Sequence, residues 1–301
     1  MTAALDAPGV ALNSAALIAL RGVALNADAA PVLAALPGGF ATRRKGHGLE
    51  VASTREYALG DDLRHLDRGT TARTGRLHVR QFQEERDRVT LLIADFRPAM
   101  FWGVRRAFRS VAAAEALTLV GWNVVESGGR VGLLAVTAAG PVIAMPRGRT
   151  RGMLDVIGAM VQAHASGLAA MINGQVDDTP LDQGLARADR LAPPGAELVI
   201  ASGFDVPGAG LADRLNALAR RRSPRLLLIT DAEAGDLPRG RYPIRLPDGR
   251  RIRVHLGGQD HRQADPLRQI AGRTALVLDA GEAVEQTARR LAAVFVAERA
   301  A

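Results

Sequence analysis

The sequence predicts an α/β protein built on a doubly wound, mostly parallel sheet, with a smaller N-terminal helical and β extension. Three apolar runs have the pattern of strands that are buried on both faces, at 89–94, 197–201 and 225–230. Segments between them carry apolar residues at every third or fourth position, which is typical of helices packed on a core. Strands that alternate with helices along the chain indicate a parallel sheet covered on both sides.

The N-terminal part is predicted to hold two short helices followed by two strands. Its elements are expected at 14–24 and 29–36 for the helices and at 50–56 and 76–82 for the strands. Pro37-Gly38-Gly39 ends the helical part, because this combination breaks regular structure. We place the domain boundary after residue 86, which gives an extension over 1–86 and the α/β domain over 87–301.

The α/β domain continues with further helices and strands in alternation. Helices are predicted at 104–122, 150–165, 181–191, 211–221 and 282–299, and a short one runs from Asp265 or Pro266 to Ile270. Further strands are predicted at 130–136, 140–145, 239–246, 250–256 and 274–278. The pair 239–246 and 250–256 is expected to form a hairpin, because Pro247-Asp248-Gly249 between them favours a turn.

Composition limits the classes of function. The chain has no cysteine, which excludes a disulfide framework, a thiolate metal site and a cysteine nucleophile. The net charge of +8 is carried almost wholly by arginine. Two explanations remain open: a surface that binds polyanions, or codon usage that favours arginine. Aromatic residues make up only 4% of the chain, so few side chains could stack on bases, and we expect no nucleic-acid partner.

The first residues lack a basic segment before their apolar part, and no run of about 18 uncharged apolar residues occurs. We therefore expect no signal peptide, no insertion into a membrane and a cytoplasmic location.

A dense charged cluster between Gly60 and Asp67 is one candidate for chemistry. Asp61, Asp62, His65 and Asp67 are suitable metal ligands, so a metal-dependent hydrolase is one hypothesis. Their spacing does not match a calcium-binding loop. The alternative is a structural role, in which the carboxylates pair with Arg64 and Arg73 and fix a loop.

Other motifs of catalysis and nucleotide binding are missing. No G-x-G-x-x-G follows the first buried strand, and the chain contains neither a G-x-x-x-x-G-K-[ST] loop nor a G-x-S-x-G elbow. The sequence therefore points to no enzyme, and we expect neither a catalytic residue nor a cofactor.

The charged cluster also carries a family resemblance. The motif positions are Arg55, Tyr57, Gly60, Asp61, Asp62, Arg64, Asp67 and Arg73. They resemble the R-x-Y-x-x-G-D-D-x-R-x-I-D-W-x-x-[ST]-A-R segment of a bacterial family known as domain of unknown function 58 (DUF58). Leu66 stands where the family has isoleucine, and Arg68 stands where it has tryptophan.

The resemblance implies a von Willebrand factor A-like domain and a role in protein–protein interaction. It also implies a partner, since such proteins occur with AAA+ ATPases of the MoxR type and would act as adaptors in the assembly or remodelling of protein complexes. Many members carry two membrane helices before the motif, and this chain resembles a short form without them.

The resemblance further implies a metal-ion-dependent adhesion site, in which a D-x-S-x-S loop, a threonine and a second aspartate surround Mg²⁺. Asp95 matches the first aspartate, but Arg97 and Ala99 replace both serines. Thr179 can stand for the threonine, whereas Gly203 stands where a carboxylate is common.

We therefore expect a degenerate site without Mg²⁺. One hypothesis is that Arg97 supplies a fixed cation beside Asp95, which would neutralise the carboxylate and repel a divalent ion. The alternative is that Arg97 points into solvent and that the site has merely decayed. Asp205 follows two residues after Gly203 and is expected to point elsewhere.

Overall fold

The computed structural model describes residues 7–27, 51–58, 66–82, 88–174, 177–231, 240–245, 251–256 and 266–296. The chain divides into two compact units. One unit comprises residues 1–36 and 89–300, and the other comprises residues 37–88.

The larger unit is built on a seven-stranded mixed sheet in the order β10-β11-β7-β6-β3-β4-β5. Its strands are β3 (Val89–Phe96), β4 (Arg130–Thr137), β5 (Val142–Gly148), β6 (Glu197–Ser202), β7 (Ser223–Thr230), β10 (Leu267–Ile270) and β11 (Arg273–Asp279). Strands β11, β7, β6, β3 and β4 are mutually parallel, and β5 and β10 pair antiparallel at the two edges. The predicted α/β fold with a doubly wound, mostly parallel sheet is thus confirmed.

The order of the strands reverses between β3 and β6. Numbered along the chain and without β10, the strands of this sheet follow the order 3-2-1-4-5-6, which is typical of doubly wound folds. The chain moves outward from β3 to β4 and β5, and then returns to the other side of β3 with β6. This reversal leaves a place at the carboxyl ends of β3 and β6 where loops diverge to opposite faces.

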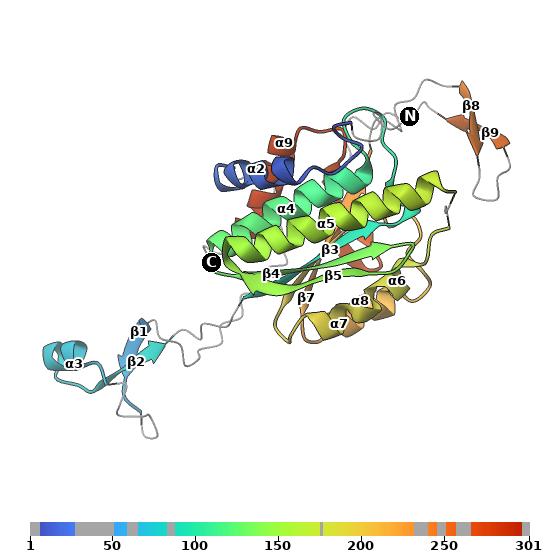
Figure 1. Cartoon of the computed structure of the whole chain (residues 1–301). Helices are drawn as coiled ribbons and strands as arrows, with labels where there is room; N and C mark the ends of the chain where they lie inside the picture. The colour runs from blue at the N-terminus through green and yellow to red at the C-terminus, as the bar shows by residue number, and fades with distance from the viewer. Residues whose placement is uncertain are drawn as a thin grey trace. The chain divides into compact units, whose positions relative to one another are not determined.

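Helices cover both faces of the sheet (Figure 1). The first face carries α2 (Ser14–Leu25), α4 (Arg109–Glu126), α5 (Arg149–Ile172) and α9 (Val284–Val296). The second face carries α6 (Leu181–Gly184), a 3₁₀ turn (Leu185–Arg187), α7 (Ala188–Leu191) and α8 (Leu211–Ala219). Because side chains alternate along a strand, Leu92 and Phe96 of β3 enter the first core, and Leu91 and Ile93 enter the second.

Helix α2 packs against α4 in the core of the larger unit. Leu17 and Leu20 are buried there, and the Trp122 indole Nε1 donates a hydrogen bond of 3.2 Å to the Leu17 carbonyl. The domain boundary predicted from the sequence placed this helix in the extension over 1–86. Its contacts are instead with the helices of the large sheet. The helix predicted at 29–36 lies outside the described residues.

The helix predicted at 266–270 is wrong, because the chain forms strand β10 there. Ile270 and Arg273 pair across a two-residue turn in which Ala271 and Gly272 have φ values of 49° and 76°. Both angles lie in the left-handed region that a tight β-hairpin turn requires. Only four residues precede this turn in the strand, which is too few for a stable helix.

Helix α5 is long and apolar enough to cross a membrane by length and composition alone, and it is the one such helix in the described part of the chain. In the structure, its buried residues Met153, Val156, Ile157 and Met160 pack in the core of the first face. Helix α5 therefore serves here as a covering helix of the sheet.

The smaller unit contains the strand pair β1 (Val51–Glu56) and β2 (His78–Phe82), which are antiparallel. Between them lies helix α3 (Arg68–Thr74), which the sequence did not predict. A Gly75 residue with a φ of 73° ends this helix. In the larger unit, strands β8 (Gly240–Arg245) and β9 (Arg251–Leu256) form the predicted antiparallel hairpin, apart from the seven-stranded sheet.

Candidate functional site

The candidate site lies at the carboxyl ends of β3 and β6, which are neighbours in the sheet. In doubly wound folds, ligands bind at the point where the strand order reverses. The end of β3 supplies Asp95 and Arg97, and the end of β6 supplies Ser202. Thr179 comes from the segment that precedes α6.

Asp95 and Arg97 form a buried ion pair, and each residue is only 1% exposed. The guanidinium binds the carboxylate with two donors, Nε to Oδ1 at 2.8 Å and Nη2 to Oδ2 at 2.7 Å. This bidentate geometry is the strongest form of the arginine–carboxylate interaction. The structure therefore confirms the prediction that Arg97 places a cation beside Asp95, and the alternative that Arg97 points into solvent is wrong.

The remaining donors of Arg97 join three segments of the chain. Its Nη1 donates to the carbonyl of Thr179 at 2.7 Å and to that of Val206 at 2.9 Å. Burial alone would lower the pKa of the Arg97 guanidinium, but its hydrogen bonds to Asp95 and the nearby carboxylates raise that pKa overall. Arg97 thus stays charged and fastens the segments around Thr179 and Val206 to the end of β3.

Asp95 has no acceptor capacity left for a metal ion. Its Oδ1 accepts from the Arg97 backbone N–H at 3.1 Å and from Nε, and its Oδ2 accepts from Nη2 and from the Ser202 hydroxyl at 2.6 Å. A carboxylate offers about four lone-pair sites, and all are used. Mg²⁺ requires six oxygen ligands in an octahedron. The arrangement around Asp95 therefore does not fit this ion.

The other positions of the expected metal site have structural contacts instead. Ala99 offers no hydroxyl, and its backbone N–H donates to the Asp178 carboxylate at 3.1 Å. Thr179 is exposed and contributes its carbonyl to Arg97. Burial raises the pKa of Asp178, although the Ala99 N–H and the Arg97 charge counteract this effect.

A second ion pair lies beside the first, between Arg109 at the start of α4 and Asp205 after β6. It depends on Gly203, because a Cβ at that position would lie 1.8 Å from the Arg109 Nη2. The residue that lacks the expected carboxylate thus makes room for a guanidinium. Asp205 points to Arg109, in agreement with the expectation that it lies away from Asp95.

The turn after β6 is held in a strained conformation. Phe204 has a φ of 53°, in the left-handed region that non-glycine residues seldom adopt. Its N–H donates to the Ser202 hydroxyl at 2.9 Å, and that hydroxyl in turn donates to Asp95. The Asp95 pair and the turn that carries Asp205 are therefore linked through Ser202.

Trp102 and Asp231 complete this edge of the sheet. The Trp102 ring lies 5.0 Å from the Arg109 guanidinium carbon, which is a cation–π contact. Asp231, at the end of β7, accepts from the Val104 N–H at 2.7 Å and fixes the loop that carries Trp102. Sequence reasoning missed Arg109 and Trp102. In the sequence, the glycine at position 203 was the sign that a large side chain could lie beside the end of β6.

His164 is a buried histidine of α5 that contacts α4. Its Nε2 lies 3.0 Å from the Ser110 hydroxyl, and its ring packs edge-on to Phe96 at a centroid distance of 5.3 Å. Burial lowers the pKa of His164 to about 4, so the ring is neutral at pH 7. This histidine is part of the core and does not reach the site at the edge.

The charged cluster of the smaller unit is only partly described. Gly60, Asp61, Asp62, Arg64 and His65 lie outside the described residues.

The described residues of the family motif are Arg55, Tyr57, Asp67 and Arg73. Asp67 is the N-cap of α3, with its carboxylate accepting the Thr70 N–H at 2.8 Å. Arg55 donates to the Glu56 carbonyl, the Tyr57 N–H donates to the Leu77 carbonyl, and Arg73 is exposed. Among the described residues, no group of three His, Asp or Glu side chains could hold a metal ion.

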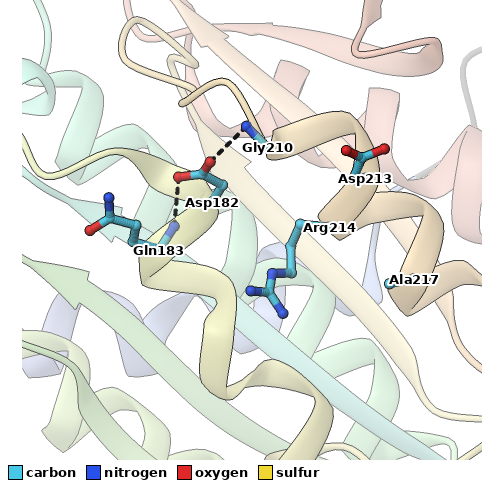
Figure 2. Close-up of a pocket in the computed structure, with 6 residues that line it drawn as sticks. All are labelled: Asp182, Gln183, Gly210, Asp213, Arg214 and Ala217. Carbon is cyan, nitrogen blue, oxygen red and sulfur yellow. Dashed lines mark hydrogen bonds between the residues drawn. The ribbon is translucent and has the colours of Figure 1, made fainter.

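An open pocket lies between α6 and α8 (Figure 2). Asp182 closes one side of it and accepts hydrogen bonds from the Gln183 N–H at 2.8 Å and the Gly210 N–H at 2.9 Å. Figure 2 shows Arg214 extending from α8 toward the space between the two helices, with Asp213 one residue earlier in α8. Asp182 thus joins the start of α6 to the loop before α8, which is a structural task.

Comparisons with known proteins match the chain to one family and to relatives without an assigned function. The model of a family described as "Protein of unknown function DUF58" matches residues 53–252. Uncharacterized proteins of Mycobacterium bovis and of two strains of Mycobacterium tuberculosis are each 35% identical over 128 residues. The match covers 40% of this chain and 39% of each relative, so it spans well under half of their length.

Proposed function

The chain belongs to the DUF58 family of proteins of unknown function, and from this membership we propose that it is a non-enzymatic protein-interaction module. Its partner would bind at the carboxyl edge of the large sheet, where β3 and β6 end. We further propose that the domain is von Willebrand factor A-like. The doubly wound strand order with an antiparallel edge strand β5 supports that assignment.

The buried pair of Asp95 and Arg97 is the observation that carries the proposal. In the adhesion site that the resemblance implies, Asp95 would help to hold Mg²⁺, and an open position on the ion would bind a partner's carboxylate. Here the guanidinium occupies both carboxylate oxygens at 2.7–2.8 Å. The module would therefore recognise its partner through protein surface alone, with a degenerate metal site beneath that surface.

The partner in this proposal is an AAA+ ATPase of the MoxR type, and the process is the assembly or remodelling of protein complexes in the cytoplasm. The support is the family resemblance, together with an edge whose buried charges are already paired. An adaptor needs a rigid surface rather than a reactive group, and the contacts of Arg97 with Thr179 and Val206 supply such rigidity.

Titration with Mg²⁺ and Mn²⁺ tests the metal part of the proposal. Isothermal calorimetry of the full chain is expected to show no heat beyond dilution, because Asp95 has no free acceptor. A variant with Arg97→Ser and Ala99→Ser serves as the positive comparison, since it frees the Asp95 carboxylate and restores the two serines of the adhesion loop. Micromolar binding by the natural chain that Asp95→Ala abolishes would contradict the proposal.

Association with the ATPase tests the adaptor part. Biolayer interferometry with an immobilised MoxR-type AAA+ ATPase from the same cell is expected to show binding that survives chelation of divalent ions by EDTA. An ATPase variant unable to hydrolyse ATP keeps one nucleotide state during the measurement. A complete lack of association in the ATP-bound, ADP-bound and nucleotide-free states would refute the adaptor role.

A further inference from the structure

We infer that the carboxyl edge of the sheet docks a cationic segment of a partner protein, a lysine or arginine flanked by apolar residues, through a patch formed by Trp102, Val104, Asp177, Asp178 and Asp205. This inference rests on the proposed function and names the chemistry that the partner must present. The proposed patch is anionic and binds a cation, whereas a metal-ion-dependent adhesion site binds a carboxylate through its metal.

The apolar half of the patch lies on the loop between β3 and α4. Trp102 is 39% exposed and Val104 is 43% exposed, although both are large apolar residues. The loop beneath them is braced, because the Trp102 carbonyl accepts the Arg109 N–H at 2.9 Å and the Val104 N–H binds Asp231. The two side chains are thus presented from a fixed backbone, which lowers the entropy that docking must overcome.

The polar half of the patch is anionic at its surface. In the second ion pair the Arg109 side chain is 7% exposed, whereas that of Asp205 is 43% exposed. In the first pair Arg97 is fully covered. The cations of both pairs therefore lie inside. Asp205, the half-buried Asp178 and the exposed Asp177 offer three accessible carboxylates, against one exposed cation, Arg105, next to Val104.

Contacts connect the loop of Trp102 with the segments of Asp205 and Asp178, and Asp177 is the chain neighbour of Asp178. Trp102 contacts Arg109, and Arg109 binds Asp205. Arg97 Nη1 binds the carbonyls of Thr179 and Val206, the residues that follow Asp178 and Asp205, and so holds these two segments next to each other. The patch is acidic in a chain whose net charge is +8, so its sign is opposite to that of the molecule.

Charge complementarity selects the occupant. A guanidinium or ammonium group can bind the exposed edge of Asp205 while its alkyl stem covers Val104 and the Trp102 ring. The face of an aromatic ring attracts cations, so the ring contributes to the binding. A partner carboxylate would instead meet Asp205 and Asp178, with both arginines covered from solvent. Aromatic residues next to a charge are typical anchors of protein interfaces.

A library of random 12-residue peptides displayed on phage, selected against the immobilised full chain, tests the inference. The selected peptides are expected to be enriched in arginine or lysine beside an apolar residue. A synthetic peptide of the consensus is expected to change the fluorescence of Trp102, since Trp122 is buried and distant from solvent. Enrichment in aspartate or glutamate, or no enrichment at all, would overturn the inference.

Variants locate the binding of the consensus peptide. Trp102→Ala, Asp205→Asn and Asp177→Lys are each expected to weaken it by about tenfold or more. Asp177 is exposed, so its substitution tests the charge without disturbing a buried pair. Asp213→Asn, on α8 at the pocket of Figure 2, is the matched control and should leave the affinity unchanged. Equal affinity in all four variants would place the peptide elsewhere and overturn the inference.

The same variants separate this inference from the adaptor role. If the ATPase binds the natural chain and the three patch variants equally, the adaptor role stands and the docking patch is refuted. If the patch selects cationic peptides but the ATPase does not associate, the patch stands and the adaptor role fails.

Discussion

Two arginines define the chemistry of the candidate site, and they differ in how far the sequence could predict them. Arg97 lies two residues from Asp95, so their pairing is local and was predictable. Arg109 and Asp205 are 96 residues apart, and Ala99 and Asp178 are 79 residues apart. Contacts at such separations depend on the strand order of the sheet, which no local pattern reveals.

Replacing Arg97 by alanine is expected to destabilise the protein by about 3–5 kcal/mol, because it leaves the buried Asp95 charge without its partner. Chemical denaturation monitored by circular dichroism measures this loss. Arg147→Ala is the control, since the Arg147–Asp155 pair of 3.1 Å is exposed. Exposed pairs contribute about 1 kcal/mol or less. Similar losses in both variants would show that Asp95 and Arg97 are not a buried pair in solution.

The buried His164 is expected to make stability depend on pH. Its pKa is lowered to about 4 in the folded state from an ordinary 6.5, so between these values the unfolded chain binds the extra proton. The contribution is fully present above pH 6.5 and is lost as the pH falls toward 4. It amounts to about 3 kcal/mol.

Denaturation of the natural chain and of His164→Gln between pH 7 and pH 4 measures this contribution by difference. Glutamine can still bind the Ser110 hydroxyl but does not titrate. The two curves of stability against pH should diverge below about pH 6.5, and parallel curves would contradict the lowered pKa of His164.

At the level of elements, the buried strands were the most predictable part of the chain. The runs that became β3, β6 and β7 combine continuous apolar character with β-branched residues. Such runs are typical of strands in a parallel sheet that is covered on both faces. Strand β10 was mistaken for a helix because its four residues are too few to show a period. Helix α3 was missed because none of its residues is buried, so it has no apolar stripe.

The end of β6 depends on a residue without a side chain. Gly203→Ala would place a Cβ 1.8 Å from Arg109 and 2.4 Å from Asp205, and both partners would have to move. We expect a loss of about 1–3 kcal/mol in the free energy of unfolding. Gly158→Ala in α5, where nothing lies within 4 Å of the new atom, should be neutral or stabilising by up to about 1 kcal/mol. Equal thermal melting points for the two variants would contradict the crowded geometry at Gly203.

At the scale of the whole molecule, the alternation of elements predicted the class of fold but not the arrangement of the strands. The sequence predicted a doubly wound sheet, but no local pattern shows which strand pairs with β3 on the side opposite β4. That pairing is decided by packing, because β3 is buried along its whole length and requires a neighbour on each side. The carboxyl edge, and hence the candidate site, exists only as a result of this arrangement.

Hydrogen exchange should follow the position of each strand in the sheet. Backbone amides of β3, which is paired on both sides and buried throughout, are expected to exchange most slowly. Those of β10, a short and partly exposed edge strand, are expected to exchange much faster. Mass spectrometry of peptides from the exchanged protein measures both. Equal protection of β3 and β10 would contradict the order of the sheet.

The pairing of β3 with β6 has a consequence for synthesis on the ribosome. Asp95 and Ser202, which meet at the site, are 107 residues apart in the chain. The centre of the sheet thus remains open on one side until β6 has left the exit tunnel, and at about 5–20 residues per second this takes some seconds. During that interval β3 presents an unpaired apolar edge, to which a chaperone is expected to bind.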